Sequence, residues 1–198
     1  MVVLKKILDF YINSSLHVAL SAFALVSMTQ YFFGVQGDFS VAFFAFFGTV
    51  VGYNFVKYDA IARLNKTEIK KELKAIVFLS FISLLACFYF FLQLRCASKL
   101  SAFAFFGLTL LYTLPFFPNK QNARNWKGVK IYIVGITWVG VTVILPLLEA
   151  EIPFTMDVLL MAFQRFLLVF SIVLVFDIVD VKHDDIHLQT VPQKIGVK

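Results

Sequence analysis

The chain has 198 residues, of which 60% are apolar, 25 are Phe and only 15% are charged. This composition excludes an ordinary soluble globular domain and indicates a membrane protein. The net charge of +6 requires no nucleic acid partner, because membrane topology alone accounts for the positions of the cations and no RNA-binding or DNA-binding pattern accompanies them. Membrane lipids are the expected partners of the basic side chains.

Six stretches are apolar enough to cross a bilayer, whose hydrocarbon core of about 30 Å requires roughly 20 helical residues per crossing. We therefore predict an all-α, polytopic membrane bundle of about six transmembrane helices. In chain order, the predicted spans are residues 10–33, 39–58, 73–94, 100–117, 130–148 and 158–179.

Lys and Arg are distributed unequally between the two sides that these spans define. One side has only Arg95 and Lys99 in its connections, and residues 149–157 on that side are acidic. Because cytoplasmic loops are enriched in Lys and Arg, we expect both termini to be cytoplasmic and the protein to reside in the inner (plasma) membrane. The basic side holds Lys5, Lys6, Lys57, Arg63, Lys66, Lys70, Lys71, Lys74, Lys120, Arg124, Lys127, Lys130, Lys182, Lys194 and Lys198.

Two polar side chains lie where the second span meets water, at the start of a connection predicted over residues 53–66. Asn54 and Asp59 are interpreted most simply as a polar helix end. The functional alternative makes them one half of a site for a metal-bound anion.

The connection after the fourth span is basic. It begins near Tyr112, contains Pro115 and then carries Lys120, Arg124 and Lys130. Proline ends a helix, so the cations follow at the membrane surface. A solvated charge run facing lipid is one interpretation; the other is a pyrophosphate-binding loop, in which cations neutralise phosphate oxygens.

The sixth span ends in a cluster of carboxylates. At about 100° per residue, Asp177, Asp180 and Asp184 fall within an arc of about 60° on one helix face. Such carboxylates repel one another unless a cation lies between them, and the hard ion Mg²⁺ prefers oxygen ligands. Arg165 lies about 18 Å from Asp177 along the helix, too far to pair with it, and is expected to snorkel outward or to contact another helix.

The segment Asp177-Ile-Val-Asp180-Val-Lys-His-Asp184-Asp185, followed by Thr190-Val-Pro192-Gln-Lys-Ile-Gly196, resembles the second aspartate-rich motif of the UbiA superfamily of membrane prenyltransferases. Asp180 and Asp184 match its DxxxD positions and Asp177 matches an additional upstream aspartate. Tyr112-Thr-Leu-Pro115 and the basic residues after it are similar to the loop after the family's fourth helix.

This resemblance implies a single UbiA-like domain over residues 1–198, corresponding to the first two thirds of a fold of about nine helices. It implies transfer of an isoprenyl group from an isoprenyl diphosphate to a hydrophobic acceptor, often an aromatic ring, with Mg²⁺ as cofactor. Asp180 and Asp184 would be catalytic, and Asp177 and Asp59 would complete the metal site. The residues expected to bind the diphosphate are Asn54, Tyr112, Lys120, Arg124 and Lys130.

The first aspartate-rich motif of the family, NDxxDxxxD, is altered in this chain. Asn54 matches its Asn, but Phe55, Tyr58 and Ala62 stand at the aspartate positions, and Asp59 is one residue out of register. These changes favour a second hypothesis, a non-catalytic relative that binds an isoprenoid or acts as a partner subunit. A small transporter is a third and weaker hypothesis, because no paired broken helices are evident.

Overall fold

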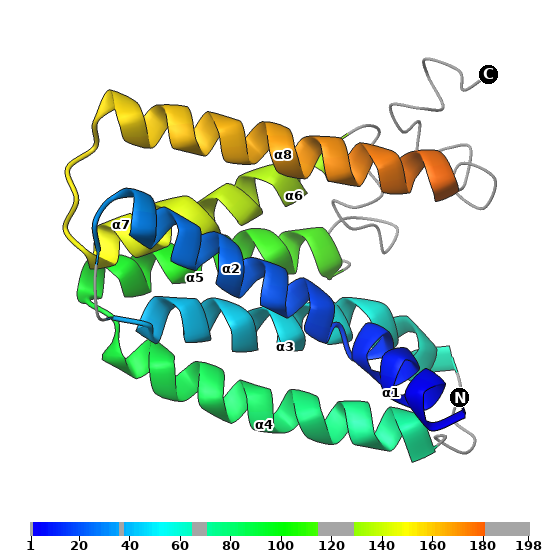
Figure 1. The fold of residues 1–198 in the computed structure, drawn as a ribbon. Coiled ribbons are helices and arrows are strands. Elements are labelled where there is room, and N and C mark those ends of the chain that lie inside the picture. Colours follow the sequence, from blue (N-terminus) through cyan, green and yellow to red (C-terminus); the bar gives the residue numbers. More distant parts are fainter. Residues whose placement is uncertain (1, 36–37, 65–70, 115–128, 181–198) are drawn as a thin grey trace. The chain divides into compact units, whose positions relative to one another are not determined.

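The computed structural model describes residues 2–35, 38–64, 71–114 and 129–180, and every regular element within these ranges is helical. The prediction of an all-α protein is confirmed. The elements are α1 (Val2–Asn13), α2 (Leu16–Phe32), α3 (Ser40–Leu64), α4 (Lys71–Gln93), α5 (Cys96–Thr113), α6 (Lys130–Val139), the π-helical turn η3 (Gly140–Ile144), α7 (Leu145–Glu149) and α8 (Met156–Asp180) (Figure 1).

The chain forms two compact units. Unit 1 comprises Met1–Lys99 with Pro146–Glu151, and unit 2 comprises Leu100–Leu145 with Ile152–Lys198. In unit 1, α3 packs against both α2 and α4. Small side chains let α2 and α3 approach closely, as in many membrane bundles; the buried ones are Ala19, Ala22 and Val26 of α2 and Val41, Ala42 and Ala45 of α3.

Aromatic rings fill the contact between α3 and α4. Phe90 of α4 stacks on Phe43 and Phe47 of α3, with ring centroids 5.2 and 6.0 Å apart, and Phe44 meets Phe91 at 6.1 Å. Aromatic pairs in this range of separation are favourable beyond the area that they bury. Part of the Phe richness of the sequence therefore serves contacts between helices.

In unit 2, α6 and η3 pack against α8. Two glycines lie beneath aromatic rings: a Cβ on Gly135 would come within 2.7 Å of the ring of Phe166, and one on Gly140 would overlap the ring of Phe105. Gly140 also begins the π-helical turn. The absence of side chains at these positions allows rings from α8 and α5 to lie directly on the helix backbone.

The structure supports an integral membrane protein. Five helical segments are long and apolar enough to cross a bilayer, or six if the bent pair α1 and α2 counts as one span. The five are Ser40–Tyr58, Leu73–Gln93, Cys96–Thr113, Lys130–Glu149 and Met156–Val179. They agree with the predicted second to sixth spans, except that the fourth starts and ends about one turn earlier. The earlier end fits Pro115, which disfavours helix in the residue before it.

The first predicted span is not one straight helix. Helices α1 and α2 meet at an angle of 60°, with buried Ser14 and Ser15 at the break. Ser15 has φ 60° and ψ 17°, a left-handed conformation that a right-handed helix cannot contain. The predicted span 10–33 is therefore interrupted at Ser14 and Ser15, and the part after the break coincides with α2.

The predicted connection over residues 53–66 was also wrong in part, because α3 continues as a helix to Leu64. The segment 53–64 contains neither Gly nor Pro and includes two alanines, an arginine and a leucine, which favour helix. Asn54 and Asp59 therefore belong to a helix, and not to a loop.

Candidate functional site

The central feature of unit 2 is an ion pair between two residues that the sequence assigned to one site. Nζ of Lys130, the first residue of α6, lies 2.8 Å from Oδ1 of Asp177 in the last two turns of α8. The side chain of Asp177 is only 3% exposed and that of Lys130 is 22% exposed. A candidate metal ligand and a candidate diphosphate partner thus come together from positions 47 residues apart.

The packing of α6 on α8 sets this register. Tyr132 contacts Phe170 with ring centroids 6.0 Å apart, and Gly135 faces Phe166. Partner positions on α8 decrease as positions on α6 increase, so the two helices run antiparallel. The beginning of α6 consequently lies against the C-terminal part of α8, where Asp177 is located.

Burial makes the Lys130–Asp177 pair electrostatically important. A carboxylate removed from solvent loses its hydration, and a charged partner with a short hydrogen bond compensates for part of that cost. The structure therefore pairs a buried carboxylate near the end of a predicted span with the ammonium group of Lys130.

Asp180 is the last residue of α8, one helical turn beyond Asp177, and Asp184 lies outside the described residues. The convergence of these three carboxylates on a cation stays a prediction. Within the described parts of the chain, no group of three or more His, Cys, Asp or Glu side chains is arranged to hold a metal ion. The oxygen chemistry of Asp177 nevertheless fits Mg²⁺, for which carboxylates are preferred ligands.

Asn54 occupies a buried position in unit 1. Its Nδ2 donates a hydrogen bond of 2.9 Å to Oγ of Ser80 in α4, and Ser80 in turn donates to the carbonyl of Ile76 at 2.8 Å. Among the residues that the structure describes, none hydrogen-bonds to its Oδ1. The interpretation of Asn54 as a polar helix end facing water is wrong: it lies among helices, and the α3–α4 packing supplies its partner.

The neighbouring positions of the altered first motif form contacts with the N-terminal helices. Tyr58 donates a hydrogen bond of 2.8 Å to the carbonyl of Asn13, and Nζ of Lys57 lies 3.3 Å from the same oxygen. Tyr58, which the sequence resemblance aligned with an aspartate, is used here in a contact at the break between α1 and α2. Asp59 follows within α3, and its side chain lies outside the described residues.

Two of the remaining predicted diphosphate partners, Lys120 and Arg124, lie outside the described residues. Tyr112 is in the last turn of α5 and is half-buried. Of the residues predicted for this site, Asp177 and Lys130 are therefore the pair that the structure joins directly.

Arg165 is a residue whose setting the sequence did not reveal. It is 3% exposed, and its guanidinium lies 3.9 Å from Sδ of Met161, one turn earlier in α8. Of the two alternatives expected for it, outward snorkelling is wrong, whereas burial is compatible with contact to another helix. The apolar residues around it in sequence gave no sign of which helix face would be covered, although a charged residue inside a predicted span already marks a position of interest.

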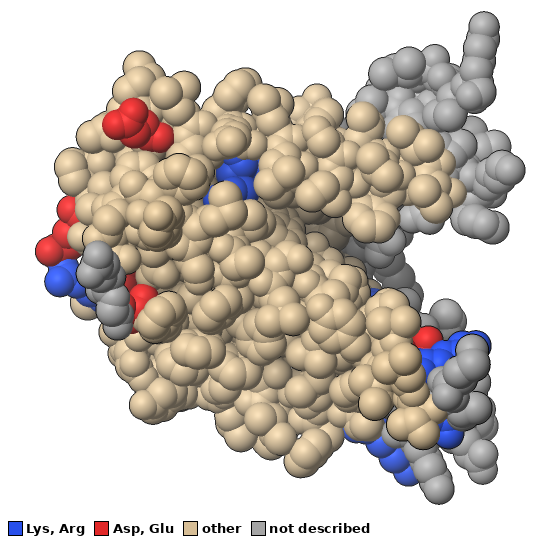
Figure 2. Space-filling model, in the orientation of Figure 1, with Lys and Arg blue, Asp and Glu red and all other residues tan. Residues whose placement is uncertain are grey.

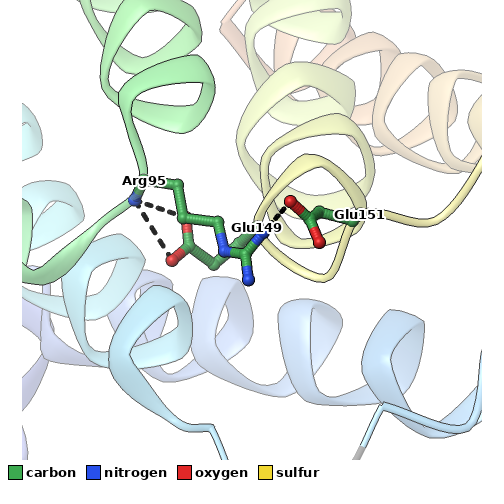
Figure 3. Close-up of polar contacts among 3 residues, drawn as sticks. All are labelled: Arg95, Glu149 and Glu151. Carbon is green, nitrogen blue, oxygen red and sulfur yellow. Dashed lines mark hydrogen bonds and ion pairs between the residues drawn. The ribbon is translucent and has the colours of Figure 1, made fainter.

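A second polar cluster, in unit 1, is a helix cap. Glu149 accepts hydrogen bonds of 3.2 and 3.0 Å from the backbone N–H of Arg95, which precedes α5, while the Arg95 guanidinium pairs with Glu151 (Figure 3). An anion at a helix N-terminus satisfies free N–H groups and favours the helix dipole. This arrangement explains the cluster without a ligand.

Comparisons of the chain with models of protein families, with curated proteins and with solved structures found no match.

Proposed function

We propose that this protein is a membrane prenyltransferase of the UbiA type, which transfers an isoprenyl group from an isoprenyl diphosphate to a hydrophobic acceptor such as an aromatic ring. The observation that supports this most directly is the 2.8 Å contact between Lys130 and Asp177. A diphosphate held through a metal ion requires carboxylates on one side and cations on the other, and this pair places one of each at the same location.

In the proposed reaction the bond between C1 of the donor and the diphosphate oxygen breaks, and the diphosphate leaves with the electron pair. The acceptor then forms a bond to the allylic C1 and loses a proton. Mg²⁺ would supply charge neutralisation of the leaving diphosphate. Lys130 would bind phosphate oxygens, Asp177, Asp180 and Asp184 would hold the metal, and the apolar helices would exclude water from the carbocation.

The test is release of pyrophosphate from a panel of isoprenyl diphosphates by the purified full chain in lipid nanodiscs, with and without Mg²⁺. Asp180→Asn is expected to reduce release by roughly a hundredfold or more, because it weakens the site for the charge that develops in the transition state. Asp157→Asn, in the first turn of α8, is the matched control and should retain activity. Equal release by wild type and Asp180→Asn rejects the proposed catalytic assignment.

A second candidate is a non-catalytic relative that binds an isoprenyl diphosphate. Two contacts favour it: Nδ2 of Asn54 donates a hydrogen bond to Ser80, and the hydroxyl of Tyr58 donates one to the carbonyl of Asn13. Both residues therefore stabilise helix packing in the region of the altered motif. Under this proposal, Mg²⁺ with a non-hydrolysable isoprenyl diphosphate analogue raises the unfolding temperature while no pyrophosphate is released. If neither release nor stabilisation occurs with any donor, both candidates fail.

A further inference from the structure

From Val3 to Asn13, helix α1 separates its side chains into an apolar and a polar face. At about 100° per residue, the apolar residues of 3–12 cover an arc of roughly 200°, and the polar residues cover roughly 100°. The apolar set is Val3, Leu4, Ile7, Leu8, Phe10, Tyr11 and Ile12. Lys5 and Lys6 lie at the two edges of the polar arc, with Asp9 and Asn13 between them.

Protein covers little of this apolar face in the described parts of the chain. Val3, Leu4, Ile7, Leu8, Phe10 and Ile12 are between 36% and 73% exposed. A helix with so much exposed apolar area would be a liability in water. The exposure is consistent with a helix whose apolar face contacts lipid.

The bend at Ser14 and Ser15 determines which part of the bilayer α1 can reach. Helix α2 has 17 residues, about 26 Å at 1.5 Å per residue, which nearly matches the hydrocarbon core by itself. A straight helix through α1 and α2 would be roughly 45 Å long, too long for that core. The bend of 60° at the start of α2 turns α1 away from the axis that a membrane-crossing α2 would follow.

Contacts at the bend stabilise this direction. The carbonyl of Asn13, the last residue of α1, accepts the hydroxyl of Tyr58 at 2.8 Å and lies 3.3 Å from Nζ of Lys57. The ring of Tyr11 lies 5.9 Å from that of His17 across the break. The C-terminal end of α1 is thereby attached to α3, and the remainder of α1 is available to lipid.

We propose that α1 is an interfacial membrane anchor, embedded at the boundary between headgroups and acyl chains and selective for anionic lipid. Helices of this type present apolar residues to the acyl region and basic residues to headgroups. Lys5 and Lys6 have the positions this requires, because an apolar stem at the edge of the polar arc can lie along the lipid while its ammonium reaches a phosphate. Figure 2 shows blue side chains gathered at the end of unit 1 where α1 begins.

The depth of α1 can be measured in the full chain with a fluorophore attached to a single cysteine. After Cys87→Ser and Cys96→Ser, Ile7→Cys labels the apolar arc and Asp9→Cys labels the polar arc. The variants are placed in nanodiscs containing nitroxide-labelled lipid, either zwitterionic or half anionic, and quenching is recorded. Only variants whose unfolding temperature equals that of the parent are compared.

Strong quenching at position 7, weak quenching at position 9 and more quenching at position 7 in anionic nanodiscs are the expected results. Each lysine near an anionic surface favours binding by roughly fivefold, so Lys5→Gln with Lys6→Gln should remove the dependence on anionic lipid. Lys74→Gln, which removes one charge outside α1, is the control and should preserve it.

Three results overturn the proposal. Equal quenching at positions 7 and 9 means that α1 does not lie in the interface. Quenching at position 7 that changes neither with lipid charge nor on Lys5→Gln with Lys6→Gln excludes anionic headgroups as the partner. A buried fluorophore at position 7 that the nitroxide lipids do not quench means that protein, such as a second copy of the chain, covers the apolar face.

Discussion

Lys130 at the beginning of α6 and Asp177 near the end of α8 form an ion pair, with Nζ 2.8 Å from Oδ1. The carboxylate is almost fully buried, whereas the ammonium retains 22% exposure. The two partners therefore differ in what their loss should cost: removal of Lys130 leaves a buried charge unpaired, and removal of Asp177 leaves an ammonium that can still reach its surroundings.

A double-mutant cycle tests this asymmetry. Lys130→Met should reduce the free energy of unfolding by about 1–3 kcal/mol, because Asp177 stays desolvated without a partner. Asp177→Leu should cost less, and the double variant should be more stable than Lys130→Met alone, since replacement of both partners by apolar groups is often close to neutral. Reversible unfolding in detergent measures the three values. Simple additivity of the two losses would show that the pair makes no energetic contribution.

The overlap that a side chain at Gly140 would make with Phe105 leads to a second prediction. Gly140→Ala should destabilise the protein by about 1–3 kcal/mol, the usual cost of overpacking, because the ring must move. Gly107→Ala is the matched control: a Cβ there meets nothing within 4 Å, so its unfolding temperature should be equal to or above that of the wild type. In the double variant Gly140→Ala/Phe105→Leu the smaller side chain at position 105 should relieve the overlap and recover part of the lost stability.

The buried hydrogen bond from Asn54 to Ser80 provides a third test. Ser80→Ala removes the acceptor for the Asn54 amide and should cost about 1–2 kcal/mol of unfolding free energy. Ser171→Ala deletes a hydroxyl that also bonds to the carbonyl four residues earlier, on an exposed face of α8, and should change stability by less than about 0.5 kcal/mol. Equal effects of the two substitutions would mean that the Asn54 contact contributes nothing specific.

The cap at the start of α5 distinguishes two neighbouring glutamates. Glu149 accepts two hydrogen bonds from the Arg95 backbone N–H, so Glu149→Gln should lower stability by about 0.5–1 kcal/mol through weaker helix capping. Glu151→Gln removes a carboxylate that is 72% exposed and should have an effect within about 0.5 kcal/mol of zero. Thermal unfolding of the two variants beside the wild type measures the difference, and equal losses would contradict the assignment of the cap to Glu149.

The apolar spans illustrate what can be read from this sequence. Residues 73–94 and 158–179 were predicted almost to the residue of the observed Leu73–Gln93 and Met156–Val179, because a bilayer requires a fixed length of apolar chain. The break between α1 and α2 could not be predicted from the sequence. Nothing in Ser14-Ser15 requires a left-handed residue, and only the packing of α1, α2 and α3 around the buried serines selects that conformation. Helix α3 likewise extends beyond the apolar stretch because its polar end is also a good helix former.

For the candidate site, the sequence by itself determined the chemistry: carboxylates at the end of one span and cations around the start of another. It also predicted that Asp177, Asp180 and Asp184 share one helix face, from helical periodicity; Asp177 and Asp180 lie in α8, and for Asp184, outside the described residues, this stays a prediction. Only the tertiary structure decided that Lys130 pairs with Asp177, that Asn54 donates a hydrogen bond to Ser80 and that Arg165 is buried. Contacts between helices depend on which faces pack together, and in a chain that is apolar nearly all round its helices, no hydrophobic periodicity identifies those faces.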